Sequence, residues 1–231
     1  MGTKTYSMEK TMHLIVGSGL ESYESFSDRN LNLCRTFLTT DNPSHISVVL
    51  TQSKPPALSV IPYKRKKIAS VSVVADPEQA TDFFRNQEGW RGSYLVTEAV
   101  PVGYEKNWPD GEITPGVCLL TLFRRKKGID RSVFLDRWHK SHTPLSLRIH
   151  PLWDYNRNVV EKYLKEDSEK FEGIVEEQVR TAAELFNPFK FFGPFPKIFA
   201  RMLLVYTDTK SFIEYPTMET YLTREYVIKS S

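Results

Sequence analysis

The order of the expected elements constrains this chain more than any other feature of its sequence. Segments rich in β-branched residues are typical of strands, and apolar residues three or four positions apart are typical of helices. The first half gives strand, helix, strand, strand, helix, strand at residues 12–18, 23–38, 46–52, 68–75, 76–86 and 93–102. After a Pro- and Gly-containing loop at 106–116 the order recurs, with strands at 117–125, 153–163, 171–178 and 220–229. Helical patterns follow the expected strands at 117–125 and 171–178. The sequence therefore predicts two consecutive βαββαβ units.

A βαββαβ unit forms an antiparallel four-stranded sheet with helices on one face, which leaves the other face to be covered. Two such units can cover each other. The segments YLVTEAV (94–100) and YLTREYV (221–227) agree at four of seven positions, at the same place in both halves, which favours a tandem repeat. We therefore predict an α+β fold of tandem ferredoxin-like units, packed sheet-to-sheet as an intramolecular dimeric α+β barrel. The first, degenerate unit spans 10–106, a linker 107–116, and the second unit 117–231.

Composition limits the classes of partner. The chain has 231 residues, 40% of them hydrophobic and 26% charged, which is typical of a globular protein. Its apolar runs are far shorter than the ~20 residues that span a bilayer, so no membrane partner is expected. Cys34 and Cys118 form no CxxC pair, and we interpret them as buried thiols in a reducing cytoplasm.

The net charge of +3 is small, although two basic tetrads, at 64–67 and 124–127, concentrate positive charge. Tandem RNA-recognition motifs share the βαββαβ order, but they need aromatic residues on a central strand. The strand at 68–75, IASVSVVA, has none. We therefore interpret the tetrads as solvated turns and expect no nucleic-acid partner.

The segment WHKSHTPLSLRIHPLW, residues 138–153, holds three of the five histidines. On a helix that starts at Asp130, Phe134, Trp138 and His142 are four residues apart and share an inward face. Pro144 disfavours helical backbone at the residue before it, so we expect the helix to end or kink there with His142 at its C-terminus. Such a histidine is suited to acid/base catalysis near neutral pH, or it only caps its own helix.

A metal site formed by His139, His142 and His150 is the alternative interpretation of the same segment. Lys140 lies between the first two, and Lys and Arg crowd nearby, so we predict no metal. His139 is expected on the solvent side, and His150 in the loop to the next strand.

The stretch LLTLFRRKKGIDRSVFLDRWHKSHTPLSL, residues 119–147, resembles the EthD family. The matching positions are Phe134, Trp138, His142, Pro144 and Leu145. WDYNRNVV (153–160) and YLTREYVIK (221–229) resemble later strands of the same family, so the resemblance covers roughly 115–230. It implies a dimeric α+β barrel, whose related families include polyketide cyclases, dehydratases, cofactor-free monooxygenases and some haem-binding enzymes. The first half lacks the His-x-Pro-Leu motif, so any site that depends on it should occur once.

From these residues we predict a cofactor-independent enzyme that acts on a small apolar carbonyl or phenolic compound, by lyase, dehydratase or cyclase chemistry. His142 is the expected general acid or base. The substrate-binding residues are expected to be Phe134, Trp138 and Trp153 as walls, with Tyr155 and Arg157 as polar contacts on one side of a strand.

The sequence leaves several alternative functions open. The first is a non-catalytic small-molecule binding or accessory protein that uses the same cavity, and the second is a haem protein with His142 as axial ligand. A homodimer is compatible with either. The segment FNPFKFFGPFPKIF, residues 186–199, contains six Phe and is a lid, a membrane-touching loop or a packed cover, of which we favour the cover.

Overall fold

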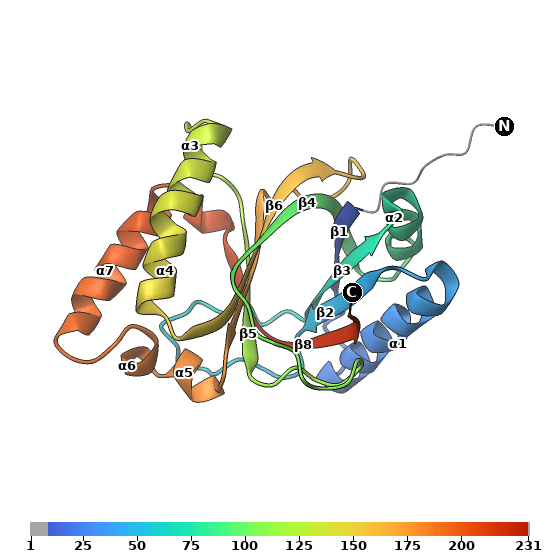
Figure 1. Ribbon diagram of the computed structural model, residues 1–231, viewed down its shortest axis with the longest axis horizontal. Helices are drawn as coiled ribbons and strands as arrows, with labels where there is room; N and C mark the ends of the chain where they lie inside the picture. Colours follow the sequence, from blue (N-terminus) through green and yellow to red (C-terminus); the bar gives the residue numbers. More distant parts are fainter. Residues whose placement is uncertain (1–8, 231) are drawn as a thin grey trace.

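The computed structural model describes residues 9–230, and its eight strands close into one antiparallel barrel (Figure 1). The strand order around the barrel is β1-β3-β2-β8-β5-β7-β6-β4, with β4 paired to β1. The strands are β1 (Glu9–Val16), β2 (His45–Leu50), β3 (Ile68–Ala75), β4 (Trp90–Val102), β5 (Val117–Phe123), β6 (Leu152–Tyr163), β7 (Gly173–Val179) and β8 (Glu219–Lys229). The mixed α/β composition and the strand segments expected from the sequence are both present.

The four strands of each half are neighbours in the barrel. The first half gives the order β4-β1-β3-β2, and the second gives β8-β5-β7-β6. Two antiparallel seams join the halves, where β2 pairs with β8 and β4 pairs with β6. Because the seams close the sheet on itself, neither half keeps a free edge.

Helices cover the outside of the barrel in two groups (Figure 1). The first group is α1 (Tyr23–Asp41) and α2 (Pro77–Arg85), and the second is α3 (Arg131–Asp136), η1 (Arg137–His142), α4 (Thr143–Ile149), α5 (Ala182–Phe186), α6 (Pro188–Phe191) and α7 (Lys197–Lys210). A short 3-10 turn, η2 (Tyr215–Thr217), precedes β8. Side-chain caps fix several helix starts: the Asp76 carboxylate, for example, accepts from the N–H groups of Glu78 and Gln79, with Pro77 in the first turn.

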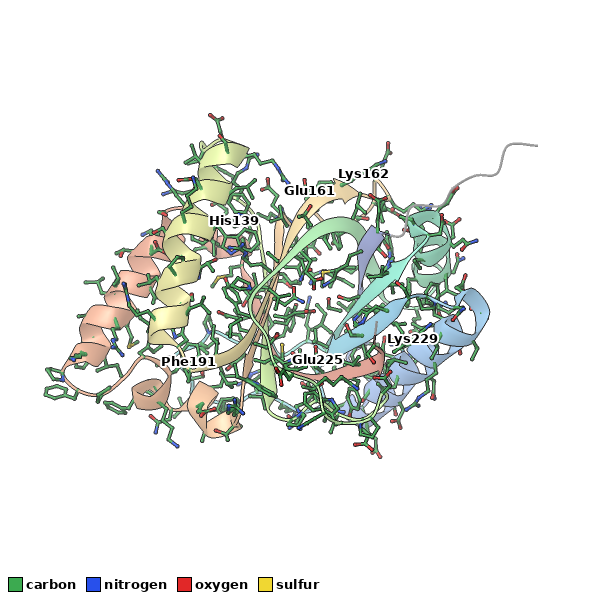
Figure 2. All side chains as sticks on the ribbon, in the orientation of Figure 1. His139, Glu161, Lys162, Phe191, Glu225 and Lys229 are labelled. Carbon is green, nitrogen blue, oxygen red and sulfur yellow. The ribbon has the colours of Figure 1, made fainter. Side chains whose placement is uncertain are left out.

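The barrel interior is apolar over much of its length, where side chains from all eight strands pack among one another (Figure 2). Tyr94 and Tyr221 are both buried in this cluster. They are the first residues of the similar segments 94–100 and 221–227. The strands of each half thus cover the inner face of the other half, which is what the βαββαβ order requires.

One end of the barrel interior is polar instead. Asp154 and Glu176 are buried there, and burial, with the nearby carboxylates of Glu225 and Glu98, raises their pKa values to about 7 and about 8. Lys10 is the cation among them and pairs with Glu98. Asp154 and Glu176 therefore titrate near neutral pH rather than in the usual acidic range.

Among residues 9–230, no helix combines the length and the hydropathy needed to cross a bilayer. Both cysteines are buried and unbonded.

Candidate active site

The helical run that carries His142 does not end at Pro144. It continues from α3 through one π-helical turn, η1, into α4, which ends at Ile149. The Thr143 N–H donates to the Trp138 carbonyl five residues earlier, and Pro144 then occupies the first turn of α4, where its missing N–H costs little. The expectation that His142 lies at a helix C-terminus is therefore wrong: it lies inside a continuous helix, at a π-turn of the kind often found at functional sites.

His142 is held between two side chains. Its Nδ1 lies 2.8 Å from Oδ2 of Asp208 on α7, and its Nε2 lies 3.1 Å from Oγ of Ser146 on α4. Only 12% of the His142 side chain and 11% of the Asp208 side chain are exposed, so water screens this pair weakly. Phe212 packs against the imidazole, with ring centroids 5.4 Å apart.

The carboxylate fixes the state of the imidazole. Burial opposes ionisation of Asp208, but hydrogen bonds from His142 and Ser141 outweigh it and lower the pKa of this carboxyl. An ionised Asp208 can only accept, so Nδ1 of His142 carries a proton, and in the neutral imidazole the lone pair then lies on Nε2. Nε2 is therefore the atom that can take a proton, either directly or from the Ser146 hydroxyl.

Asp208, His142 and Ser146 are hydrogen-bonded in the sequence of a hydrolytic triad. The surroundings of Ser146, however, differ from those of a nucleophilic serine. Ser146 is buried inside α4, where backbone N–H groups bond within the helix. No pair of free N–H donors is thus available beside its hydroxyl to stabilise an oxyanion. The arrangement fits proton transfer by His142 better than acyl transfer through Ser146.

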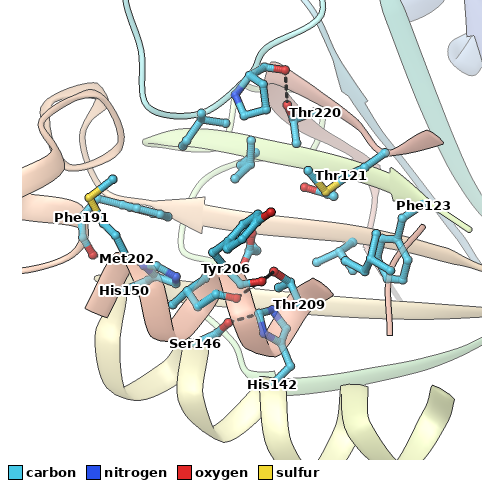
Figure 3. A pocket seen from close by; sticks show the side chains of 18 of the residues that line it. Thr121, Phe123, His142, Ser146, His150, Phe191, Met202, Tyr206, Thr209 and Thr220 are labelled. Atoms are coloured by element: carbon cyan, nitrogen blue, oxygen red, sulfur yellow. Dashed lines mark hydrogen bonds between the residues drawn. The ribbon is translucent and has the colours of Figure 1, made fainter. Parts of the chain in front are cut away.

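His142 and Ser146 line a cavity of about 610 Å³ between the second helix group and the sheet (Figure 3). Its volume is in the range of small-molecule sites. Its lining is mostly apolar and aromatic, and comes from the 60–62 loop, β5, β6, β7, β8, the helical run, α6, α7 and the 212–218 segment between α7 and β8. It includes Val60, Ile61, Leu119, Phe123, Trp138, Tyr155, Val175, Phe191, Phe192, Met202, Val205, Phe212 and Ile213.

Glu177 on β7 is the acidic residue of the sheet wall, and sequence reasoning missed it. Burial alone raises the pKa of its carboxyl to about 7. Around neutral pH it is thus partly protonated and can donate a hydrogen bond. The sequence does contain a signal for Glu177. Val175, Glu177 and Val179 share one face of β7, and a carboxyl among apolar residues on such a face is an informative exception to the pattern.

Two of the five expected substrate-binding residues, Trp138 and Tyr155, line this cavity. Phe134 lies behind it, fully buried against Trp138 with ring centroids 5.6 Å apart. Phe134 therefore supports the wall from the core and does not form its surface.

Trp153 lies elsewhere. It is the extra residue of a β-bulge, because Leu152 pairs with Val179 while Asp154 pairs with the adjacent Gln178. The bulge breaks the alternation that would place Trp153 beside Tyr155, and its ring packs on Tyr104 at a separate hollow. The expectation that Trp153 walls the site is wrong for this reason.

Arg157 shares the outer face with Tyr155 but does not line the cavity. Its Nη1 donates to the Thr143 hydroxyl at 2.7 Å, which in turn donates to the Trp138 carbonyl at 3.0 Å. Arg157 thus stabilises the π-turn instead of contacting the cavity.

Of the other two histidines of the segment, His139 differs from expectation, whereas His150 lies in the connection between α4 and β6 where it was expected. His139 is half-buried, and burial, together with the Arg157 charge, lowers its pKa, so it does not lie on an open solvent face. His150 lines the cavity, stacked on Phe191 with its Nδ1 3.1 Å from the Phe191 carbonyl, and burial lowers its pKa to about 4. Within residues 9–230, no group of three or more His, Cys, Asp or Glu is arranged to hold a metal ion.

Haem does not fit this donor set. Both ring nitrogens of His142 are already hydrogen-bonded, so an axial bond to iron would displace Asp208 or Ser146. His150 has one nitrogen on a backbone carbonyl and is packed between Phe191 and Phe192.

The Phe-rich segment 186–199 is only partly a packed cover. Phe191, Phe192 and Ile198 are buried against α4 and the sheet, while Phe189, Phe195 and Phe199 are exposed.

Comparison with known proteins identifies the fold only. No family model matches the chain, and no curated protein does. Among solved structures, a candidate monooxygenase of Fusobacterium nucleatum superposes with a TM-score of 0.51 at 10% identity, over 96% of this chain and 94% of the other. An anthrone oxidase-like protein superposes with a TM-score of 0.58 at 12% identity, over 96% and 92%. The chain therefore has a fold compatible with the dimeric α+β barrel.

Proposed function

We propose that this protein is a cofactor-independent enzyme that moves a proton on a small apolar carbonyl or phenolic compound, with His142 as the general base or acid. The observation that carries the proposal is the placement of His142, oriented by Asp208, at the wall of an apolar cavity. A carboxylate-oriented imidazole in a water-poor pocket is suited to abstraction of a proton from carbon or from a phenol.

Glu177 supplies the complementary function from the opposite wall. With a pKa of about 7 it is protonated in part of the population at neutral pH, and can donate to the oxygen of a bound carbonyl. As Nε2 of His142 removes the proton next to that carbonyl, negative charge develops on the oxygen and the Glu177 hydrogen bond strengthens. The product of this step is an enolate or enol, and the proton resides on His142.

The fate of the enolate decides the reaction. We favour loss of water or ring closure, because each needs only the proton that His142 has taken and can return. The names of the two structural neighbours favour a second candidate, in which the electron-rich enolate or phenolate reacts with dioxygen as the oxidant.

We infer that residues 10–106 and 117–231 are duplicated ferredoxin-like units joined by 107–116, so that the chain is an intramolecular dimeric α+β barrel. The identical strand order of the halves and the equivalent burial of Tyr94 and Tyr221 support this. The His-x-Pro-Leu motif at 142–145 supports an EthD-like second unit. The two free, buried cysteines are compatible with a cytoplasmic protein.

The test is incubation with a panel of bicyclic and tricyclic aryl ketones and phenols, with and without dioxygen, followed by mass spectrometry of the products. Turnover by the wild type that His142→Gln loses supports the assignment, and loss of a mass equal to water, or gain of oxygen, identifies the branch. If His142→Gln turns over the same compound equally well, His142 is not the acid or base. Tight binding without any product would favour the non-catalytic binding protein.

A further inference from the structure

Helix α7 is apolar on two sides, and only one of them is covered. Ile198 is buried, and Met202 and Val205 pack partly buried against the second helix group and the cavity. On the other side, Phe199 and Leu203 follow each other at a spacing of four residues and are 68% and 63% exposed. Figure 1 shows α7 at the outer edge of the molecule, farther from the barrel than α4.

The exposed side continues beyond the helix itself. Phe195, just before α7, is 72% exposed, and its ring centroid lies 6.4 Å from that of Phe199. Tyr206, seven residues after Phe199 and so on the same side, is 44% exposed. We call Phe195, Phe199, Leu203 and Tyr206 the outer face; contiguous large apolar side chains of this kind mark an interaction surface.

Charge around the outer face has one sign. From Leu185 to Thr207 the chain contains Lys190, Lys197 and Arg201 and no Asp or Glu. Lys190 and Lys197 are exposed, whereas Arg201 is partly buried and donates to the Phe192 carbonyl. The rest of the chain contains both acidic and basic residues. Residues 185–207 are therefore distinct in combining aromatic side chains with positive charge alone.

The outer face also borders the mouth of the cavity. Leu203 and Tyr206 are exposed to solvent and line the cavity as well. An apolar surface on which the outer face rests would therefore lie beside the route by which an apolar molecule enters.

We propose that the outer face docks on the surface of an anionic lipid bilayer, contrary to the expectation of no membrane partner. Phenylalanine and leucine enter the headgroup–acyl boundary, and the flanking lysines contact the negative headgroups. A second copy of the chain fits less well, because twofold pairing through this face would bring the exposed Lys190 and Lys197 of both copies into one interface, with no Asp or Glu in residues 185–207 to pair with them. Lipid binding does not depend on the reaction proposed above.

The experiment is co-sedimentation of the full chain with vesicles of phosphatidylcholine, alone or mixed with phosphatidylglycerol. We expect binding to the mixed vesicles that weakens as salt is raised, and little binding to phosphatidylcholine alone. Replacing Lys190 and Lys197 by Glu should weaken binding by at least about 25-fold, since each lysine near such a surface contributes about fivefold. Lys162→Glu/Lys170→Glu changes the net charge equally at two exposed positions, one near the end of β6 and one in the turn after it, and should retain most of the binding.

A second pair of variants tests the apolar contribution. Phe195→Ser/Phe199→Ser should weaken binding by roughly tenfold per residue. Leu20→Ser/Leu58→Ser removes two apolar side chains that are even more exposed and lie outside the outer face, and it should leave binding unchanged. The proposal is overturned if the wild type does not co-sediment with mixed vesicles, or if each variant binds them as tightly as its control does. It is also overturned if the outer face instead forms a dimer that Phe199→Ser dissociates.

Discussion

The raised pKa of Glu177 makes a specific prediction about stability. Glu177→Gln removes the ionisable group and keeps a side chain of similar size. In the unfolded chain this carboxyl titrates at 4.5, and in the native protein burial raises its pKa to about 7. Between these values the native protein holds a proton that the unfolded chain has released, so the free energy of unfolding falls as pH rises.

The size of this fall follows from the gap between the two pKa values. Each pH unit of difference corresponds to about 1.36 kcal/mol, so Glu177 removes at most about 3 kcal/mol of stability between pH 4.5 and pH 8. The side chain is only partly buried, which makes this an upper bound. Glu177→Gln lacks this dependence, and its stability relative to the wild type should therefore rise with pH by about 1–3 kcal/mol.

Urea unfolding of both proteins at several pH values measures the effect. A constant cost of burying the amide cancels, because only the change with pH is compared. Glu166→Gln, at an exposed turn, is the matched control and should follow the wild type. Parallel curves for wild type and Glu177→Gln would refute the claim that the cavity wall perturbs this carboxyl.

Other predictions concern the same region. If Glu177 donates as an acid, the reaction rate should decline as pH rises above about 7, and Glu177→Gln should flatten that limb of the pH–rate profile. Asp208→Asn should lower the rate by about a hundredfold or more while ligand binding persists, since it removes the group that sets the His142 tautomer. Trp138→Ala should cost about 3–5 kcal/mol in urea unfolding because Trp138 is buried among Phe123 and Phe134. Glu176 has a pKa of about 8, so its carboxyl lowers the free energy of unfolding as pH rises from 4.5 to 8. Glu176→Gln should lack this pH dependence in the same urea unfolding series.

Much of the fold follows from local pattern. The strand segments and the βαββαβ order are readable because side-chain alternation and helical spacing are properties of a few consecutive residues. The inward direction of Trp138 and the cavity position of Tyr155 follow from the same periodicities. His142 was singled out by spacing and by the EthD-like motif, and it does line the cavity.

What the pattern missed depends on contacts between distant segments. Asp208 lies 66 residues after His142, and only the packing of α7 on η1 brings them together. The bulge that removes Trp153 from the site is set by pairing with β7, and the π-turn before Pro144 is stabilised by Arg157 from β6. Such features are determined by tertiary structure rather than by propensity.

The central claim is that His142 exchanges a proton with an apolar molecule held in the cavity. The most direct measurement is the exchange of α-hydrogens of aryl ketones for deuterium in D2O, followed by NMR, because it detects proton abstraction whatever reaction follows. Quenching of tryptophan fluorescence, to which Trp138 at the cavity wall contributes, reports ketone binding in parallel. We expect the wild type to accelerate exchange of a ketone that binds, and His142→Gln to bind this ketone without accelerating its exchange. Equal exchange in the two proteins, or binding by the wild type without any acceleration, would contradict it.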